Sequence, residues 1–226
     1  MIKVGWCFAK NTMDLIGFEP EKLKGITGRS NFCPAITNQY KNAYVIKSPI
    51  NLHLKFNKWE DGNPLIDLLP DSSVQDSHFE NIVKIHNKED FSNPKIPLIQ
   101  LLLDFVFVTD TKKLHMESLP PFLEYRPDSY PVRYTSYQFD IYDWVRPAQV
   151  GLEWMDINKD IIIKRGDPIM YIRFNSKEEI KLIHIERTDR LTEEINRNIS
   201  VKNLLKDHSV FVMKKAGLIR HKNWLS

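Results

Sequence analysis

Two histidines and one carboxylate in this chain have the side-chain types of a ferrous iron site. His115 and Glu117, in "KLHMES", are two residues apart, so they project from the same side of a strand. His184, in "LIHIER", lies far downstream and is followed by Arg187 and Arg190. A 2-His-1-carboxylate set binds one face of Fe(II) and leaves open positions for substrate and oxygen. The three residues are a candidate metal site, and Arg187 or Arg190 could hold a carboxylate cosubstrate bidentately.

A structural interpretation of the same residues stays open. His115 and Glu117 would share their strand face with Lys113, a pattern that is typical of a solvated surface. His184 would share its face with Glu186, as a partly buried histidine that is paired with a carboxylate does. A His-x-Glu pair therefore occurs twice in this short chain, and the pattern alone does not identify a metal site.

Polar residues also interrupt the most apolar stretch of the chain, "LIQLLLDFVFV" at residues 98 to 108. Its flanking prolines and its Phe-Val-Phe-Val end favour a central strand, covered on both faces, over a helix. Asp104 and Gln100 lie inside this stretch. A buried carboxylate needs a partner or a raised pKa. Asp104 is thus a candidate catalytic acid, although a carboxylate at a strand end or one bonded to backbone amides fits equally well.

The composition excludes several classes of function. The formal net charge of +3 is a small difference between 32 basic and 29 acidic residues, so no whole-protein field favours nucleic acid as a partner. There are only 8 glycines, and none lies between Gly62 and Gly151, so neither a G-x-G-x-x-G loop nor a P-loop can be drawn. Arg133 and Arg146 flank an aromatic-rich segment that could stack bases, but strand propensity explains its aromatics as well.

The N-terminus "MIKVGWCFAK" alternates like a strand and lacks the apolar core of a signal peptide. No apolar run approaches the roughly 20 residues that span a bilayer. We therefore expect a cytoplasmic protein, in the host cytoplasm if it is viral, that is not secreted or inserted in a membrane. Cys7 and Cys33 would then be reduced thiols.

The elements that must position these residues are mainly strands. Strands at intervals of about ten residues, without crossover helices, predict a mainly β (α+β) fold, an antiparallel β-sandwich or jelly-roll-like domain with a helical C-terminal segment. The predicted strands cover residues 2 to 8, 43 to 56 with a break at Ser48-Pro49, 98 to 108, 132 to 142, 161 to 174 and 180 to 187. The 161 to 174 segment is predicted to be a β-hairpin around Gly166-Asp167, in which Gly166 supplies a positive φ.

Helical patterns are confined to a few segments. Short helices are possible near residues 13 to 23 and 63 to 69. After Arg187 the pattern becomes helical, with Thr188 or Asp189 as the N-cap and a second start at Ser200. We expect a β-rich domain over residues 1 to 187 and a helical appendage, residues 188 to 226, packed on the same domain. The appendage ends in a basic, amphipathic tail, residues 202 to 222, of the kind that docks on its own domain or on a neighbouring subunit.

The segment "IIIKRGDPIMYIRF" resembles the strand-turn-strand of jelly-roll proteins such as cupins and 2-oxoglutarate oxygenases, in which a Gly-Asp turn precedes the distal metal histidine. This resemblance implies Fe(II) and 2-oxoglutarate as cofactors, with His115, Glu117 and His184 as ligands. The segment is also similar to one in trimeric dUTP pyrophosphatases and dCTP deaminases, which implies nucleotide binding. The C-terminus "MKKAGLIRHKNWLS" departs from the glycine-rich segment that closes the pyrophosphatase site.

Taken together, "WCFAK", "CPAITN", "YVIKSP", "FDIYDWVRP" and "RGDPIMYIRF" resemble a family of uncharacterised proteins of similar length from tailed phages, cyanophages among them, and from bacteria. The resemblance covers most of the chain and supplies no mechanism or catalytic residues. The leading hypothesis is a β-rich binding or assembly module of phage type, with a protein partner or a second copy as its target. The alternatives are the oxygenase and the nucleotide-binding protein.

Overall fold

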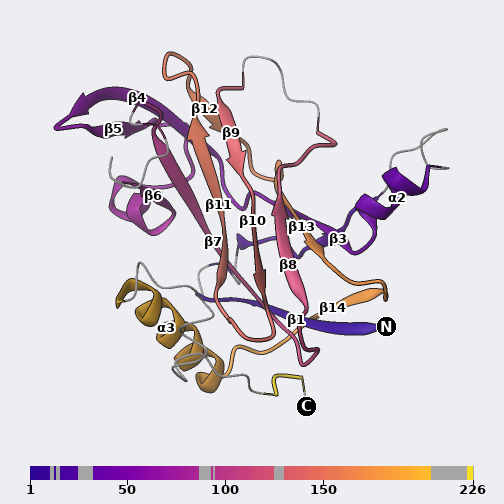
Figure 1. Cartoon of the computed structure of the whole chain (residues 1–226). Coiled ribbons are helices and arrows are strands. Elements are labelled where there is room, and N and C mark those ends of the chain that lie inside the picture. The colour runs from indigo at the N-terminus through magenta and orange to yellow at the C-terminus, as the bar shows by residue number, and fades with distance from the viewer. Residues whose placement is uncertain are drawn as a thin grey trace.

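The computed structural model describes residues 1–10, 13, 16–24, 33–86, 93, 95–124, 130–204 and 223–225. Within these residues the protein is mainly β, with its strands arranged in three sheets (Figure 1). The helical elements are α2 (Pro34–Tyr40), the 3-10 helix η2 (Asp76–Asn81) and α3 (Asp189–Leu204). The predicted fold class, a mainly β domain with a helix near its C-terminus, is confirmed.

The strands of the first sheet are β1 (Ile2–Phe8), β6 (Val83–Ile85), β7 (Leu98–Val108), β9 (Val132–Thr135), β11 (Pro147–Trp154) and β14 (Ile180–His184). They follow the order β14-β1-β7-β11-β9, and β6 pairs with another part of β7. The second sheet has the order β10-β8-β13-β3-β2. Its strands are β2 (Glu21–Lys22), β3 (Ala43–Lys47), β8 (His115–Leu119), β10 (Tyr137–Asp140) and β13 (Pro168–Phe174). The third consists of β12 (Ile161–Ile163), β4 (Leu52–Glu60) and β5 (Asn63–Leu68).

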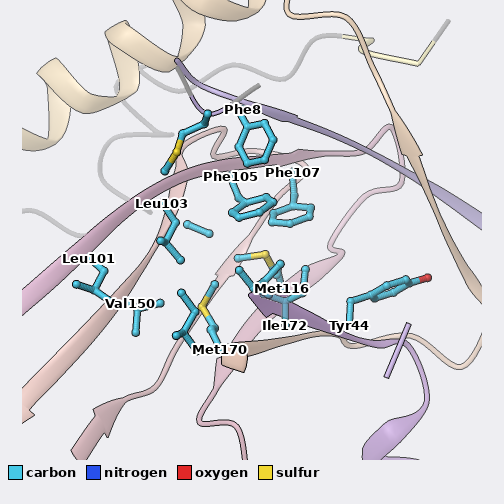
Figure 2. Close-up of a cluster of buried hydrophobic side chains, with 14 of the residues drawn as sticks. Phe8, Tyr44, Leu101, Leu103, Phe105, Phe107, Met116, Val150, Met170 and Ile172 are labelled. Atoms are coloured by element: carbon cyan, nitrogen blue, oxygen red, sulfur yellow. The ribbon is translucent and has the colours of Figure 1, made fainter. Parts of the chain in front are cut away.

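The main core lies between the first two sheets (Figure 2). Alternate residues of β7 point into it, and they meet residues of β8 and β13 from the other side. The ring centroids of Phe107 and Phe174 are 5.8 Å apart in an edge-to-face arrangement, which the quadrupoles of the two rings favour. Two stacked sheets with an apolar interior are the layers of a β-sandwich.

The opposite face of β7 is covered at one end by α3, which lies along one side of the molecule (Figure 1). Val106 and Val108 pack in one buried cluster with Leu191 and Ile195 of the helix. This cover explains why the second half of β7 is apolar on both faces, as predicted. None of the described helices is long and apolar enough to cross a membrane.

The N-cap of α3 is Thr188, the first of the two predicted alternatives, Thr188 and Asp189. The Thr188 Oγ1 accepts a hydrogen bond from the Leu191 amide at 3.3 Å, which satisfies one of the free donors of the first turn. The helix then runs without interruption to Leu204, so the predicted second start at Ser200 is wrong. Ser200 does not begin a new helix because continuous i to i−4 bonding outweighs its capping preference.

The segment around Gly166-Asp167 connects two sheets and is not a hairpin. β12 pairs with β4 in the three-stranded sheet, whereas β13 pairs with β3 and β8 in the five-stranded sheet. The strand segment that pairs with β12 and β13 is interrupted at the same level, between β3 and β4, where Pro49 supplies no amide donor. The Gly166 amide donates to the Ser48 carbonyl at 2.8 Å, so the two breaks are tied together. An antiparallel ribbon thus bends at one corner, and the sequence pattern of a bent ribbon resembles that of a hairpin.

Three other predictions differ from the structure. Residues 63 to 68 form β5, which pairs with β4 through an Asp61-Gly62 turn with positive φ at both positions, so the expected helix there is wrong. Residues 132 to 142 divide into β9 and β10, which lie in different sheets. β1 pairs with β14 in parallel, while the other described pairs are antiparallel.

We expect the replacement Gly166→Ala to destabilise the fold by about 1 kcal/mol, because residue 166 has a φ of +89° and an added Cβ strains this conformation without meeting any neighbour. The cost is measured by urea unfolding. Gly166→Asn is the matched control and should cost less, since asparagine tolerates left-handed backbone. Equal stability of Gly166→Ala and the wild type would contradict the strain argument.

Candidate functional site

One edge of β7 changes its partner along its length, and a gap opens at the change. Residues 99 to 101 pair with β6, and residues 105 to 108 pair with β1. Between them, the Leu102 amide donates to the Ile82 carbonyl at 2.8 Å, and the Asp104 carbonyl accepts from the Ala9 amide at 2.7 Å. On the other edge, the register with β11 shifts between Ala148 and Val150. The backbone of β7 is therefore irregular on both edges at the same level.

Asp104 lies at this irregularity and has a left-handed backbone, with a φ of +58°. In the described part of the chain, three other residues besides glycines have a positive φ: Asn42, Asp61 and Lys113. Those three lie in turns, whereas Asp104 is inside a strand. Such a conformation costs about 1–3 kcal/mol and persists where the surrounding structure enforces it, often at functional sites.

A cavity of about 550 Å³ opens beside Asp104. Its apolar lining consists of Met13, Ile16, Ile50, Val74, Ile82 and Leu102. Its polar lining consists of Lys10, Ser73, Gln75, His78, Asn81 and Asp104. Asp104 is only 6% exposed, while Gln75, His78 and Asn81 are exposed residues of the η2 region. The cavity thus combines a mainly aliphatic wall with one buried carboxyl group.

The charge of Asp104 is compensated from the rim of the cavity. The Lys10 Nζ lies 3.1 Å from the Asp104 Oδ2, and the Lys10 side chain is 49% exposed. Burial raises the pKa of the Asp104 carboxyl above its ordinary value, and the lysine offsets part of that rise. The sequence-based expectation that a buried carboxylate at this position needs a partner or a raised pKa is confirmed on both counts.

The residues of the predicted iron site lie in two different sheets. His115 and Glu117 are on β8, and His184 is on the edge strand β14. Glu117 accepts hydrogen bonds from the Nε and Nη2 of Arg173 at 3.1 and 2.6 Å, and His184 packs against the Trp6 ring at a centroid distance of 4.6 Å. In the described residues, no group of three or more histidine, cysteine, aspartate or glutamate side chains could hold a metal ion. The arrangement does not bring the three predicted ligands together.

The two predicted cosubstrate arginines make structural contacts. The Arg187 Nη1 donates to the Ala9 carbonyl at 2.7 Å. The Arg190 guanidinium lies over the Trp224 ring, 5.4 Å from its centroid. Both arginines thereby link the start of α3 to distant parts of the chain.

His53 forms a constellation that the sequence did not indicate. Its Nδ1 lies 2.8 Å from the Asp71 Oδ1, and its Nε2 lies 3.0 Å from the Asp160 Oδ2. Because both ring nitrogens are occupied, neither is available to bind a metal or to exchange a proton with a substrate. The histidine instead links β4 to the segments before β12 and after β5.

The sequence could not predict which residues line the Asp104 cavity, because they come from segments that are far apart in the chain. The one signal that could be found was the polar residue at position 104 in an apolar strand. Lys10 and His78 gave no such signal, since isolated surface lysines and histidines are common.

We expect the free energy of unfolding of Asp104→Asn at pH 7 to exceed that of the wild type by about 0.5–1 kcal/mol. Functional residues are often unfavourable for stability, and asparagine tolerates left-handed backbone. The raised pKa means that the wild type loses stability as the pH rises from the ordinary aspartate pKa through the raised one. The variant should lack this loss. Chemical unfolding between pH 3.5 and 7 checks it, and a large loss of stability in the variant would show that Asp104 is structural.

The stability conferred by His53 should also fall as the pH rises, in a higher pH range than for Asp104. The hydrogen bond to Asp71 is the main cause that raises the pKa of His53, and Asp160 adds to it. This stabilisation is present below the ordinary histidine pKa and is lost as the pH rises through the raised value. We expect His53→Gln to flatten the fall in Tm between pH 6 and pH 9. An unchanged pH profile in that variant would argue against a protonated His53.

Neither the models of known protein families, nor the curated proteins, nor the solved structures gave a match. The resemblances described from the sequence, to phage proteins and to jelly-roll enzymes, therefore stay predictions.

Proposed function

We propose that this protein is a β-sandwich binding module, and that its ligand is a small aliphatic molecule with a primary amine that enters the Asp104 cavity. The observation that carries the proposal is the buried, backbone-strained carboxyl of Asp104 in an otherwise mainly aliphatic wall. A cavity of about 550 Å³ lies within the range of about 300–1,000 Å³ that is usual for small-ligand sites. An ammonium group there would form a charge-assisted hydrogen bond in a medium of low dielectric.

Lys10 supports the proposed charge of the ligand, because it already places an ammonium group against Asp104. Its side chain is half-exposed and has a flexible stem, so it can move into solvent when another cation arrives. The exchange of one ammonium for another keeps the carboxylate compensated throughout. The aliphatic part of the ligand would gain about 25 cal/mol for each Å² of apolar surface that it buries.

The other hypotheses from the sequence stay predictions. A phage-type assembly role through the basic tail concerns residues 202 to 222, most of which lie outside the described residues. The oxygenase with Fe(II) and 2-oxoglutarate gains no support from the positions of His115, Glu117 and His184. The leading hypothesis from the sequence is a binding or assembly module. The Asp104 cavity supports binding and suggests the class of ligand.

Isothermal titration calorimetry with hexylamine, hexan-1-ol and hexanoate tests the proposal, since the three probes share a chain and differ in the head group. Hexylamine should bind at least about 10-fold more tightly than hexanol, which corresponds to about 1.4 kcal/mol, and hexanoate should bind most weakly. Equal affinities for the three probes would reject the role of the carboxyl.

Asp104→Asn should reduce the affinity for hexylamine to that for hexanol. Asp67→Asn is the matched control, because Asp67 is an exposed aspartate on β5 that does not line the cavity. It should bind hexylamine like the wild type. If Asp104→Asn retains the wild-type affinity, the ligand does not use this carboxyl and the proposed site is wrong.

A further inference from the structure

A second cavity, of about 230 Å³, lies between α3 and the six-stranded sheet. The polar side chains around it come from five segments: Lys84 from β6, Gln100 from β7, Trp144 and Arg146 from the segment before β11, Gln149 from β11, and Asn198 from α3. Its lining contains two cationic residues and no carboxylate. This lining thus differs in charge from that of the Asp104 cavity, which contains one lysine and one carboxyl group.

Arg146 is the central charged group of this cavity. Its guanidinium lies over the Trp144 ring, 4.6 Å from the centroid, and 5.8 Å from the centroid of Phe139. No acidic side chain in the described residues forms an ion pair with it, and burial lowers the pKa of the guanidinium. Stacking on aromatic faces compensates a buried guanidinium only in part, because its five N–H donors need acceptors. The donors of Arg146 are therefore available to a ligand.

Two neutral groups of the same cavity also have unused hydrogen-bonding capacity. The Trp144 Nε1 and the Asn198 Oδ1 are buried, and in the described structure neither has a hydrogen-bond partner. The Asn198 Nδ2 donates to the Val145 carbonyl at 2.9 Å, which fixes the orientation of the amide. Buried polar groups are almost always satisfied, so one donor and one acceptor without partners in one cavity need an explanation.

We propose that this cavity is a binding site for a small oxyanion that carries a hydroxyl group. The oxyanion would accept hydrogen bonds from Arg146 and from the Trp144 Nε1, with the exposed Lys84 adding charge at the rim. The hydroxyl would donate to the Asn198 Oδ1. Hydrogen phosphate and small α-hydroxycarboxylates share this chemistry, and both are of a size for the cavity.

The proposed oxyanion site is independent of the amine site, although Leu102 lines both cavities. Its residues come from β6, β7, the segment before β11, β11 itself and α3, whereas Asp104 and Lys10 take no part in it. Binding would connect Asn198 on α3 to Arg146 beside the sheet. An occupied site should therefore hold α3 more firmly against the six-stranded sheet.

The test is isothermal titration calorimetry of the whole chain in a buffer without phosphate, with inorganic phosphate, lactate and sulfate as probes. Sulfate matches phosphate in shape and lacks a hydroxyl at neutral pH. We expect phosphate or lactate to bind at least about 10-fold more tightly than sulfate. Equal binding of all three would overturn the hydroxyl requirement, and no binding of any probe at millimolar concentration would overturn the site.

Three variants identify the residues. Arg146→Lys keeps the charge and loses the planar fork, so it should weaken binding of the preferred probe at least about 10-fold. Lys84→Ala should weaken it several-fold, and Asn198→Asp should abolish it by placing a carboxylate beside Arg146. Lys181→Ala is the matched control, because Lys181 is an exposed lysine on β14 that does not line the cavity.

The control should bind like the wild type. Of the three substitutions, Lys84→Ala should disturb folding least, since the Lys84 side chain is on the surface. If Lys84→Ala and Arg146→Lys both keep wild-type affinity, the oxyanion binds elsewhere and the proposal is wrong. The Asp104→Asn variant should bind phosphate and lactate normally, which separates this site from the amine site.

Discussion

The fold depends on the pairing of β7, which is bonded on both edges and covered on both faces over its second half. One edge carries β11, and the other is shared by β6 and β1. Its inward residues fill the sandwich core, and its outward valines receive α3. Since so many contacts converge on eleven residues, the irregularity at Asp104 can be held in place by the regular pairing before and after it. The same irregularity separates β6 from β1 and leaves room for a cavity.

Much of the fold could be predicted from local patterns, because strand alternation and turn residues are encoded within a few positions. The buried strand at 98 to 108, the break at Pro49 and the cap at Thr188 are examples. Partner choice is encoded much less clearly. No local sequence feature distinguishes a hairpin, in which two consecutive strands pair with each other, from two consecutive strands that lie in different sheets, as β12 and β13 do. The parallel pairing of β1 with β14 is likewise a property of the assembled fold.

The candidate sites were predictable to different degrees. Asp104 gave a signal because a carboxylate in an apolar strand must have a reason to be there. Arg146 lay beside aromatic residues that could stack bases or simply form a strand, and in the structure its guanidinium stacks on Trp144 of the same chain. The pair His115 and Glu117 had suitable spacing for a ligand set. Spacing along one strand, however, does not bring His184 of another sheet close to the pair. Cavities depend on segments from several elements, and a single sequence does not report that proximity.

The parallel pair of β1 and β14 has a consequence for the order of folding. Residue 2 pairs with residue 180, so β1 leaves the ribosome long before β14 is available to bond its outer edge. Contacts this distant in sequence close slowly, and unpaired strand edges attract other chains in the meantime. β1, whose residues 4 to 8 are all buried in the final structure, is thus open to misassembly until β14 has been synthesised.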